Sequence, residues 1–238
     1  MKQLDLLQKR VTVMLIPRYI FAGEYAGLYD YFLTQPHKEK SFHKGAYLWA
    51  PSELIEQVYY IKSGIAQTLV EHENGYQKIL FFHGTDTVFP GCHQTAFKIE
   101  QAIVTKAITS METLAFARKD FYHMFQTNQM LNAITFESYA KYINLLIYET
   151  AHQEYNNSFI KLCNMLYLFS HAEPGKFNQK INLTQENMAS ILTINRVNVA
   201  KCLGRLRDEG IIASHRTWLE IKDPDGLCAH CSHETLDV

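Results

Sequence analysis

Residues 184–207, TQENMASILTINRVNVAKCLGRLR, contain the pattern that decides the fold. Thr184 can cap a helix that extends to residue 192, because its hydroxyl can accept from the free backbone N–H groups of a first helical turn. After a short turn at residues 193–195, Asn195 can cap a second helix that runs through Leu206. Two helices separated by such a turn form a helix-turn-helix, so this stretch predicts a DNA-reading unit.

The second of these helices has one apolar face and one polar face. Val199, Leu203 and Leu206 recur at helical spacing and are expected to face inward. The opposite face is then free to enter the major groove of DNA. The candidate DNA-binding residues are Arg196, Val197, Asn198, Lys201 and Arg205 on this helix, with Thr184 and Gln185 at the start of the first helix.

Residues on either side of the two helices add a second contact region. Residues 211–222 have the pattern of a β-hairpin with a polar tip at 214–217, which predicts a wing beside the helix-turn-helix. His215 and Arg216 at the tip, and Lys180 before the first helix, are expected to contact phosphates. Such contacts contribute affinity rather than sequence preference.

Charge is unevenly distributed along the chain, whose net charge is −1. Residues 176–222 hold eight Lys or Arg against four acids, which leaves fifteen against twenty in the rest. A basic segment on an acidic body predicts that this segment alone binds a polyanion, and we expect double-stranded DNA. The sequence shows no acid pair, nucleophile elbow or phosphate-binding glycine loop that would indicate an enzyme.

The expected location follows from apolar runs and cysteine usage. No apolar run approaches the roughly 18 residues that cross a bilayer, and residues 1–17 lack the pattern of a secretory signal. The five cysteines are odd in number and unevenly spaced, unlike a secreted disulfide framework. We therefore expect a cytoplasmic protein with reduced thiols and no membrane partner.

Residues 45–117 have the pattern of a β-domain. Glycines punctuate them at intervals, and Asn74-Gly75 suits a tight turn in which both residues have positive φ. This spacing predicts closure into a sandwich or barrel. Strands rich in β-branched and aromatic residues are expected at 57–62, 65–71, 76–82, 101–108 and 112–117.

The pattern changes to helix after residue 118, and the helix expected over 130–155 is apolar on two faces. One face carries Phe136, Tyr139, Ile143, Leu146 and Thr150. The other face carries Leu131, Ile134, Leu145 and Tyr148. One face can pack on the β-domain and the other on a second copy of the chain. An ordinary core helix inside a monomer is the alternative.

These motifs resemble the cyclic-AMP receptor/fumarate-nitrate regulator (CRP/FNR) family of bacterial transcription factors. The likeness rests on Tyr59-Tyr-Ile-Lys-Ser-Gly64, on Lys78-Ile-Leu80, on the long helix and on residues 183–212. It implies an α+β fold and a homodimer on a roughly palindromic DNA site, with RNA polymerase as a further partner. The implied parts are an N-terminal β-roll, a cyclic-nucleotide-binding-like jelly roll that senses an effector (1–120), a long dimerisation helix (121–155) and a C-terminal winged helix-turn-helix with a polar tail (156–238).

The family's base-reading positions fall on Arg196, Val197, Asn198 and Lys201. In the common family pattern the second of these is a glutamate. Valine cannot accept a hydrogen bond, but it can pack against a thymine methyl, so an A/T-rich site is expected. With the overall layout, this valine also resembles the halorespiration regulators that respond to chlorinated phenols.

The resemblance also bears on the effector, which is expected to be a small organic molecule rather than cyclic AMP. Cyclic-nucleotide members hold the phosphate with an Arg-Ser pair, and Gln101-Ala102 stands at that place here. Iron–sulfur members need cysteines near the N-terminus, where this chain has none before Cys92. The candidate effector-binding residues are Phe82, Phe89, Tyr139 and Tyr142, with Lys141 as a partner for a phenolate or carboxylate.

Other readings of the sensor stay open. Cys92-His93 lies where carbon-monoxide-sensing relatives place haem ligands, which makes a haem-based gas or redox sensor one alternative. A member that binds DNA without an effector is another. Cys228, Cys231 and His233 offer soft ligands for zinc, although they lie in a polar tail with nothing around them to fix the geometry. We therefore predict no cofactor or metal beyond the organic effector.

Overall fold

The structure is a computed structural model of the 238-residue chain. It describes residues 16–49, 53, 55–90, 102–172, 176–215 and 218–236.

Two β-sheets form the N-terminal half of the chain. The first has the strand order β1-β6-β5-β8-β3 and consists of β1 (Ile20–Phe21), β6 (Gln77–His83), β5 (Ala66–Glu71), β8 (Ile103–Ala107) and β3 (Tyr47–Trp49). The second has the order β2-β9-β4-β7 and consists of β2 (Lys38–Phe42), β9 (Met111–Ala117), β4 (Gln57–Ser63) and β7 (Val88–Phe89). The strands expected from the sequence are therefore confirmed, with boundaries that shift by one or two residues.

Hydrophobic packing holds these sheets together. Ile61, Leu69 and Val104 are fully buried among the apolar residues that the strands direct inward. A second apolar cluster, around Phe32 and Phe116, packs the short helices η1 (Ala26–Leu28) and α2 (Tyr29–Leu33) on the other sheet. The two sheets thus form a β-roll, as expected.

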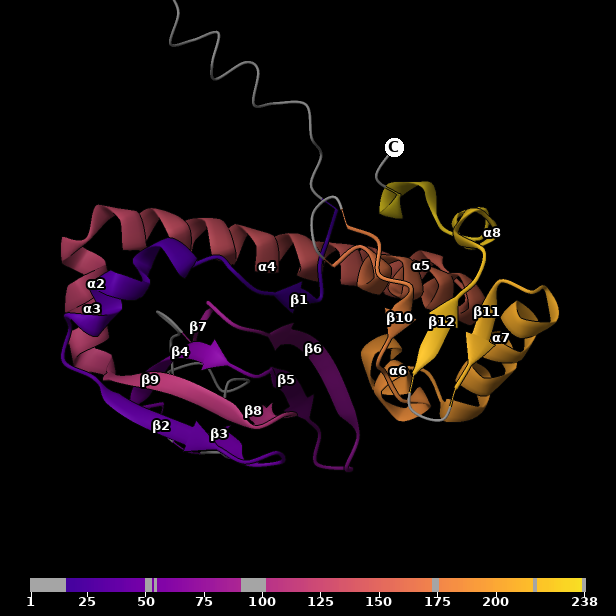
Figure 1. Cartoon of the computed structure of the whole chain (residues 1–238). Coiled ribbons are helices and arrows are strands. Elements are labelled where there is room, and N and C mark those ends of the chain that lie inside the picture. The colour runs from indigo at the N-terminus through magenta and orange to yellow at the C-terminus, as the bar shows by residue number, and fades with distance from the viewer. Residues whose placement is uncertain are drawn as a thin grey trace, which may run out of the picture.

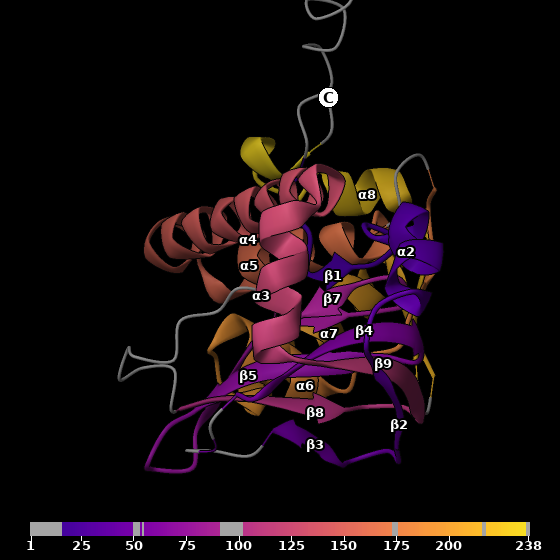
Figure 2. The same ribbon diagram turned by 90° about the vertical axis from the view of Figure 1, so that its left-hand side faces the viewer.

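The long helix α4 (Gln129–Tyr155) runs along one side of the roll (Figure 1). The helix α3 (Arg118–Thr127) precedes it at a sharp angle, as Figure 2 shows. Asn128 separates the two and caps α4, because its side chain accepts a hydrogen bond from the backbone of Leu131. Leu131 and Leu145 face the roll and are fully buried, whereas Phe136 and Ile143 are more than half exposed on another face.

The C-terminal part begins with α5 (Ser158–Ser170), whose second half is buried throughout. The reading unit, residues 176–222, packs on it. The unit consists of β10 (Lys180–Ile181), α6 (Gln185–Leu192), α7 (Arg196–Asp208), β11 (Ile212–Ser214) and β12 (Leu219–Ile221), and its three strands have the order β10-β12-β11. The expected two helices and hairpin are therefore confirmed, and β10 is a strand that the sequence pattern did not predict.

A polar junction joins the roll, α4 and the reading unit. The ammonium group of Lys78, on β6, donates both to Glu149 on α4 and to the backbone carbonyl of Ile191 at the end of α6. The hydroxyl of Tyr19, just before β1, donates to the same Glu149. Gln153 on α4 also donates to the Leu192 carbonyl at 3.2 Å. The last carbonyls of α6 are thus satisfied by groups from outside the reading unit.

The residues after the reading unit do not form the exposed polar tail that we expected. They form α8 (Pro224–Cys228) and η3 (His233–Thr235), and Leu227 and Thr235 are fully buried. The Tyr148 hydroxyl lies 2.9 Å from Thr235 Oγ1. Asn164 on α5 exchanges two hydrogen bonds with Ser232, at 2.8 Å each. This segment is therefore held against α4 and α5.

Within the described residues, no helix has both the length and the apolar character that a bilayer crossing requires.

Candidate functional site

The first reading helix, α6, begins with a reciprocal cap. The Thr184 hydroxyl accepts from the backbone N–H of Asn187 at 3.0 Å, and the Thr184 backbone N–H donates to the Asn187 side chain at 3.2 Å. The helix ends at Thr193, which has a positive φ of 55° that side chains rarely adopt. The sequence predicted the Thr184 cap, and the structure also shows its partner, Asn187.

The second reading helix, α7, is oriented as its apolar spacing predicted. Asn195 caps it by accepting from the backbone N–H of Asn198 at 2.7 Å. Val199, Leu203 and Leu206 are buried against α5 and α6.

The opposite face of α7 is open at its N-terminal end. Arg196 and Lys201 are exposed and Asn198 is half-buried, while Val197 exposes 62% of its surface. A valine with that exposure contributes little to the core, so the stability of the fold does not account for it.

Arg205, which we expected to contact DNA, is exposed and also contacts α5. Its guanidinium lies 3.9 Å from the centre of the Phe159 ring on α5, a cation–π distance. Its Nε also donates to Glu209 at 2.8 Å, and His230 lies 2.7 Å from the other oxygen of Glu209. Hydrogen bonds from Arg205 and His230 lower the pKa of Glu209. Arg205 thus lies on the flank of α7 that faces α5, because α5 supplies an aromatic ring there.

The wing carries a stack of three side chains that the sequence did not predict. The His215 and Trp218 rings lie parallel with centroids 3.7 Å apart, and the Lys180 ammonium lies 4.8 Å from the centre of the Trp218 ring. Glu220 lies 3.2 Å from His215 and 3.0 Å from Lys222, and these two neighbours lower its pKa. The expected contact at Arg216 lies outside the described residues.

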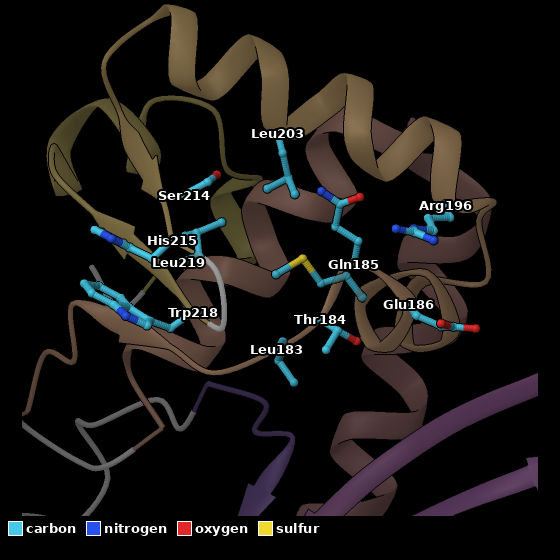
Figure 3. Close-up of a pocket in the computed structure, with 11 residues that line it drawn as sticks. Leu183, Thr184, Gln185, Glu186, Arg196, Leu203, Ser214, His215, Trp218 and Leu219 are labelled. Carbon is cyan, nitrogen blue, oxygen red and sulfur yellow. The ribbon is translucent and has the colours of Figure 1, made fainter.

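A recess of about 310 Å³ separates the wing from the two helices. In Figure 3, Trp218 and His215 line one side of it and Arg196 the other, with Thr184 and Gln185 from the start of α6 between them. The first N–H groups of α6 and the cations of Lys180 and Arg196 favour negative charge in this region. The arrangement suits a nucleic-acid backbone, since helix N-termini and basic side chains are common phosphate contacts.

The structure brings only some of the expected effector residues together. Phe89 and Tyr142 lie in one aromatic cluster with Phe81 and His83, in which Phe81 stacks on Tyr142 at 5.0 Å. The Tyr139 hydroxyl donates to the Pro90 carbonyl at 3.4 Å at the edge of this cluster.

Two expected effector residues lie elsewhere. Phe82 packs on Phe169 of α5, because neighbouring residues of a strand point to opposite faces. Lys141 lies outside the roll, 3.4 Å from Glu137 and 4.0 Å from Glu24.

His83 is a member of this cluster that the sequence did not single out. It is fully buried, and burial lowers its pKa to about 3, so its imidazole is neutral. Its Nδ1 lies 3.5 Å from the Tyr142 hydroxyl, and its Nε2 has no hydrogen-bond partner among the described residues. The only sequence signal was its position at the end of a predicted strand.

The candidate ligands for haem and for zinc lie in different parts of the chain. Cys92 and His93 lie outside the described residues. Cys228, Cys231 and His233 lie in α8, the turn after it and η3, and no three His, Cys, Asp or Glu side chains of the described residues form a group that can hold a metal ion. Burial raises the pKa of Cys228 and Cys231.

Comparison with known proteins bears directly on the reading unit. Residues 160–230, which run from α5 to the end of α8, match the family model described as the Crp-like helix-turn-helix domain. Over 203 residues the chain is 23% identical to the fumarate and nitrate reduction regulatory protein of Salmonella typhi, a match that covers 82% of this chain and 79% of the relative. These matches support a regulator of the CRP/FNR family. The motifs predicted a DNA-binding transcription regulator of that type, and the similar proteins are regulators rather than enzymes.

Solved structures agree on the fold of this regulator. The regulator CprK in complex with OCPA superposes with a TM-score of 0.69 at 19% identity, covering 91% of this chain and 98% of CprK. A CooA variant from Carboxydothermus hydrogenoformans gives a TM-score of 0.68 at 18% identity, covering 81% of this chain and 87% of CooA. The roll, the long helix and the reading unit thus recur together in these regulators.

Proposed function

We propose that this chain is an effector-controlled homodimer that binds a palindromic, A/T-rich DNA site. The observation that carries the proposal is the exposed N-terminal end of α7, where Arg196 lines the recess beside the wing and Val197 and Lys201 are exposed on the same helix. No group of the core requires an exposed valine between two exposed cations. That pattern suits a helix whose N-terminal residues enter the major groove.

Each exposed side chain has a distinct role in the proposed complex. Arg196 donates to guanine O6 and N7 or to a phosphate, whereas Val197 offers only methyl contact and favours thymine. Lys201 adds a cation one turn further along the same face. Lys180 on β10 and the His215–Trp218 stack of the wing contact the backbone, as do Thr184 and Gln185 at the start of α6. Arg205 supports α7 from behind through Phe159 and Glu209.

The second copy of the chain packs on the exposed apolar stripe of α4. Phe136, Ile143, Leu146 and Ile147 each expose between 45 and 64% of their surface, on the side away from the roll. Phe136 and Ile143 are one heptad apart, the spacing of a helix that packs along a parallel or antiparallel partner. Two copies joined in this way present two reading helices, which matches a palindromic site. RNA polymerase is the expected further partner of such a regulator.

Effector control is supported by the neighbouring structures, among which CprK is a complex with OCPA. A small organic effector also suits the abundance of aromatic and apolar groups where the roll meets α4.

The test is site selection from a random duplex pool. We expect the wild type to select an inverted repeat with thymine at the position that residue 197 reads. Val197→Glu restores a hydrogen-bond acceptor and shifts that position only, by about 1–3 kcal/mol per base pair.

Val197→Ala is the matched control, because it removes the methyl contacts without adding an acceptor. It should weaken the thymine preference without creating a new one. Binding should also weaken steeply as salt rises, since several cations displace phosphate counterions. If Val197→Glu left the selected motif unchanged, or if binding ignored salt, the proposed reading face would be wrong.

A further inference from the structure

A cleft of about 400 Å³ lies outside the roll, between α4 and the segment that contains β1. One wall is formed by the N-terminal segment, residues 16–24, and the other by one face of α4. Half of the lining residues are apolar (Ile16, Pro17, Ile20, Phe21 and Ala140), and the others are Arg18, Glu24, Glu137, Lys141 and Asn144. This volume and lining are typical of a small-molecule site, since such sites are concave and apolar with a few polar groups at defined places.

The polar groups of the cleft leave one cation without a close acceptor. The ammonium of Lys141 lies 3.4 Å from Glu137 and 4.0 Å from Glu24, both longer than a charge-assisted hydrogen bond. Arg18 adds a second cation to the lining. Burial raises the pKa of Glu24. The cleft therefore combines an apolar body with a cationic head.

The aromatic cluster inside the roll offers less room. Phe81, His83, Phe89 and Tyr142 pack with ring centroids 4.0 to 6.2 Å apart, which are contact distances for rings. The cavity beside it, next to Pro90 and Tyr139, measures only about 10 Å³ among the described residues. Phe21 forms a shared wall, because it lines the cleft and also lies 4.1 Å from the Tyr142 ring.

We infer that the cleft between residues 16–24 and α4 is a ligand site for a small apolar acid, whose anionic group pairs with Lys141 and whose apolar part packs on Ile20 and Phe21. The inference rests on the proposed effector control and assigns it a location. It keeps Lys141 as the partner of the anion that the sequence suggested, but it moves the apolar contacts from Phe82 and Phe89 to the N-terminal segment. Because Phe21 contacts Tyr142, a bound acid that moves Phe21 also changes the packing of the aromatic cluster in the roll.

The experiment uses four molecules that share one ring: benzoate, benzyl alcohol, benzylamine and toluene. Binding to the full chain is measured by titration calorimetry or by ligand-observed NMR. We expect benzoate to bind about tenfold more tightly than the alcohol or toluene, since a charge-assisted hydrogen bond is worth that much, and benzylamine to bind weakest. Equal affinities for all four, or a preference for the amine, would overturn the assignment of a cationic head.

Three variants locate the site. Lys141→Met keeps the apolar stem and should reduce benzoate binding to the level of toluene. Ile20→Trp should fill the cleft and reduce the binding of both molecules. Lys119→Met, which removes an exposed lysine on α3, should change neither. DNA binding by each variant shows that it has folded. If benzoate binding survived Ile20→Trp in a protein that still binds DNA, the ligand would lie elsewhere.

The outcomes separate this inference from the proposed function. If no acid binds while sequence-specific DNA binding is intact, the assignment of the cleft is wrong and the proposed DNA-binding function is unaffected. If benzoate binds in the cleft but DNA affinity is the same with and without it, the site stands and effector control by this class of molecule fails.

Discussion

Lys78 is expected to hold the reading unit against the roll, so Lys78→Met should destabilise the chain far more than the loss of an ordinary surface pair. The lysine side chain is 26% exposed and its partner Glu149 only 12% exposed. The substitution keeps the apolar stem but leaves the Ile191 carbonyl and the Glu149 carboxylate without their cation. An unsatisfied buried polar group costs about 1–3 kcal/mol. Glu149 keeps the bond from Tyr19, so we expect a total loss of ~2–4 kcal/mol in the free energy of unfolding.

Lys106→Met is the matched control. Lys106 on β8 pairs with Glu71 on β5 at 2.8 Å, with side chains 24% and 25% exposed, and both partners belong to the same sheet. Its loss should cost less than about 1 kcal/mol, as for exposed ion pairs in general.

Urea unfolding measures both losses of stability, and the fluorescence of the two tryptophans reports on the roll and the wing separately. Trp49 lies in the roll and Trp218 in the wing. Variants with Trp49→Phe or Trp218→Phe therefore report one unit each. In Lys78→Met the Trp218 transition should move to lower urea than the Trp49 transition, whereas in the parent the two coincide. Protein concentration is held constant, since dimerisation contributes to apparent stability. Equal losses for Lys78→Met and Lys106→Met, with coincident transitions in both, would refute this role of the junction.

Four further changes test other parts of the molecule. Ile143→Asp should yield monomers by sedimentation velocity, because it places a charge in the proposed dimer contact. His83→Phe should reduce the loss of unfolding free energy at acid pH. In the parent, the unfolded histidine takes up a proton below about pH 6.5, while the folded one stays neutral down to about pH 3. The unfolding free energy of the parent therefore falls by ~1.4 kcal/mol per pH unit in that window because of this residue. Arg205→Ala should weaken DNA binding less than Lys201→Ala in a mobility-shift titration, since Arg205 packs on α5. Tyr19→Phe should leave benzoate binding intact and reduce its effect on DNA affinity, since it loses only the bond to Glu149.

The parts of the fold that local chemistry determines were predicted from the sequence. Thr184 and Asn195 cap their helices through backbone groups three residues away, and the inward spacing of Val199, Leu203 and Leu206 needs only the helical period. The same holds for the wing, because residues 211–222 alternate within a single hairpin. In each case the decisive partners are near neighbours in the sequence.

The side-chain contacts that the sequence did not predict depend on partners that are remote in the sequence. The polar face of α7 predicted that Arg205 is exposed, which it is, but its contact with Phe159 on another helix could not be predicted. Phe81 and Phe82 are adjacent on one strand, so only one of them can face the roll interior, and the register with β5 decides which. Leu227 and Thr235 are buried because the last residues meet α4 and α5. No local pattern carries that information.

The N-terminal segment gives the proposed ligand a physical route to the reading unit. Ile20 and Phe21 form a wall of the cleft, and Tyr19 beside them donates to Glu149, which also accepts from Lys78. Lys78 in turn binds the last turn of α6. Lys141 and Glu149 lie two turns apart on α4, about 12 Å along the helix axis. The cleft and the junction are therefore both formed between α4 and the short N-terminal segment that contains β1. A molecule that changes the distance between residues 16–24 and α4 cannot do so without changing the geometry at Glu149. The end of α6 is the part of the reading unit that is hydrogen-bonded to this junction. We therefore expect a bound ligand to change the orientation of the reading helices relative to α4.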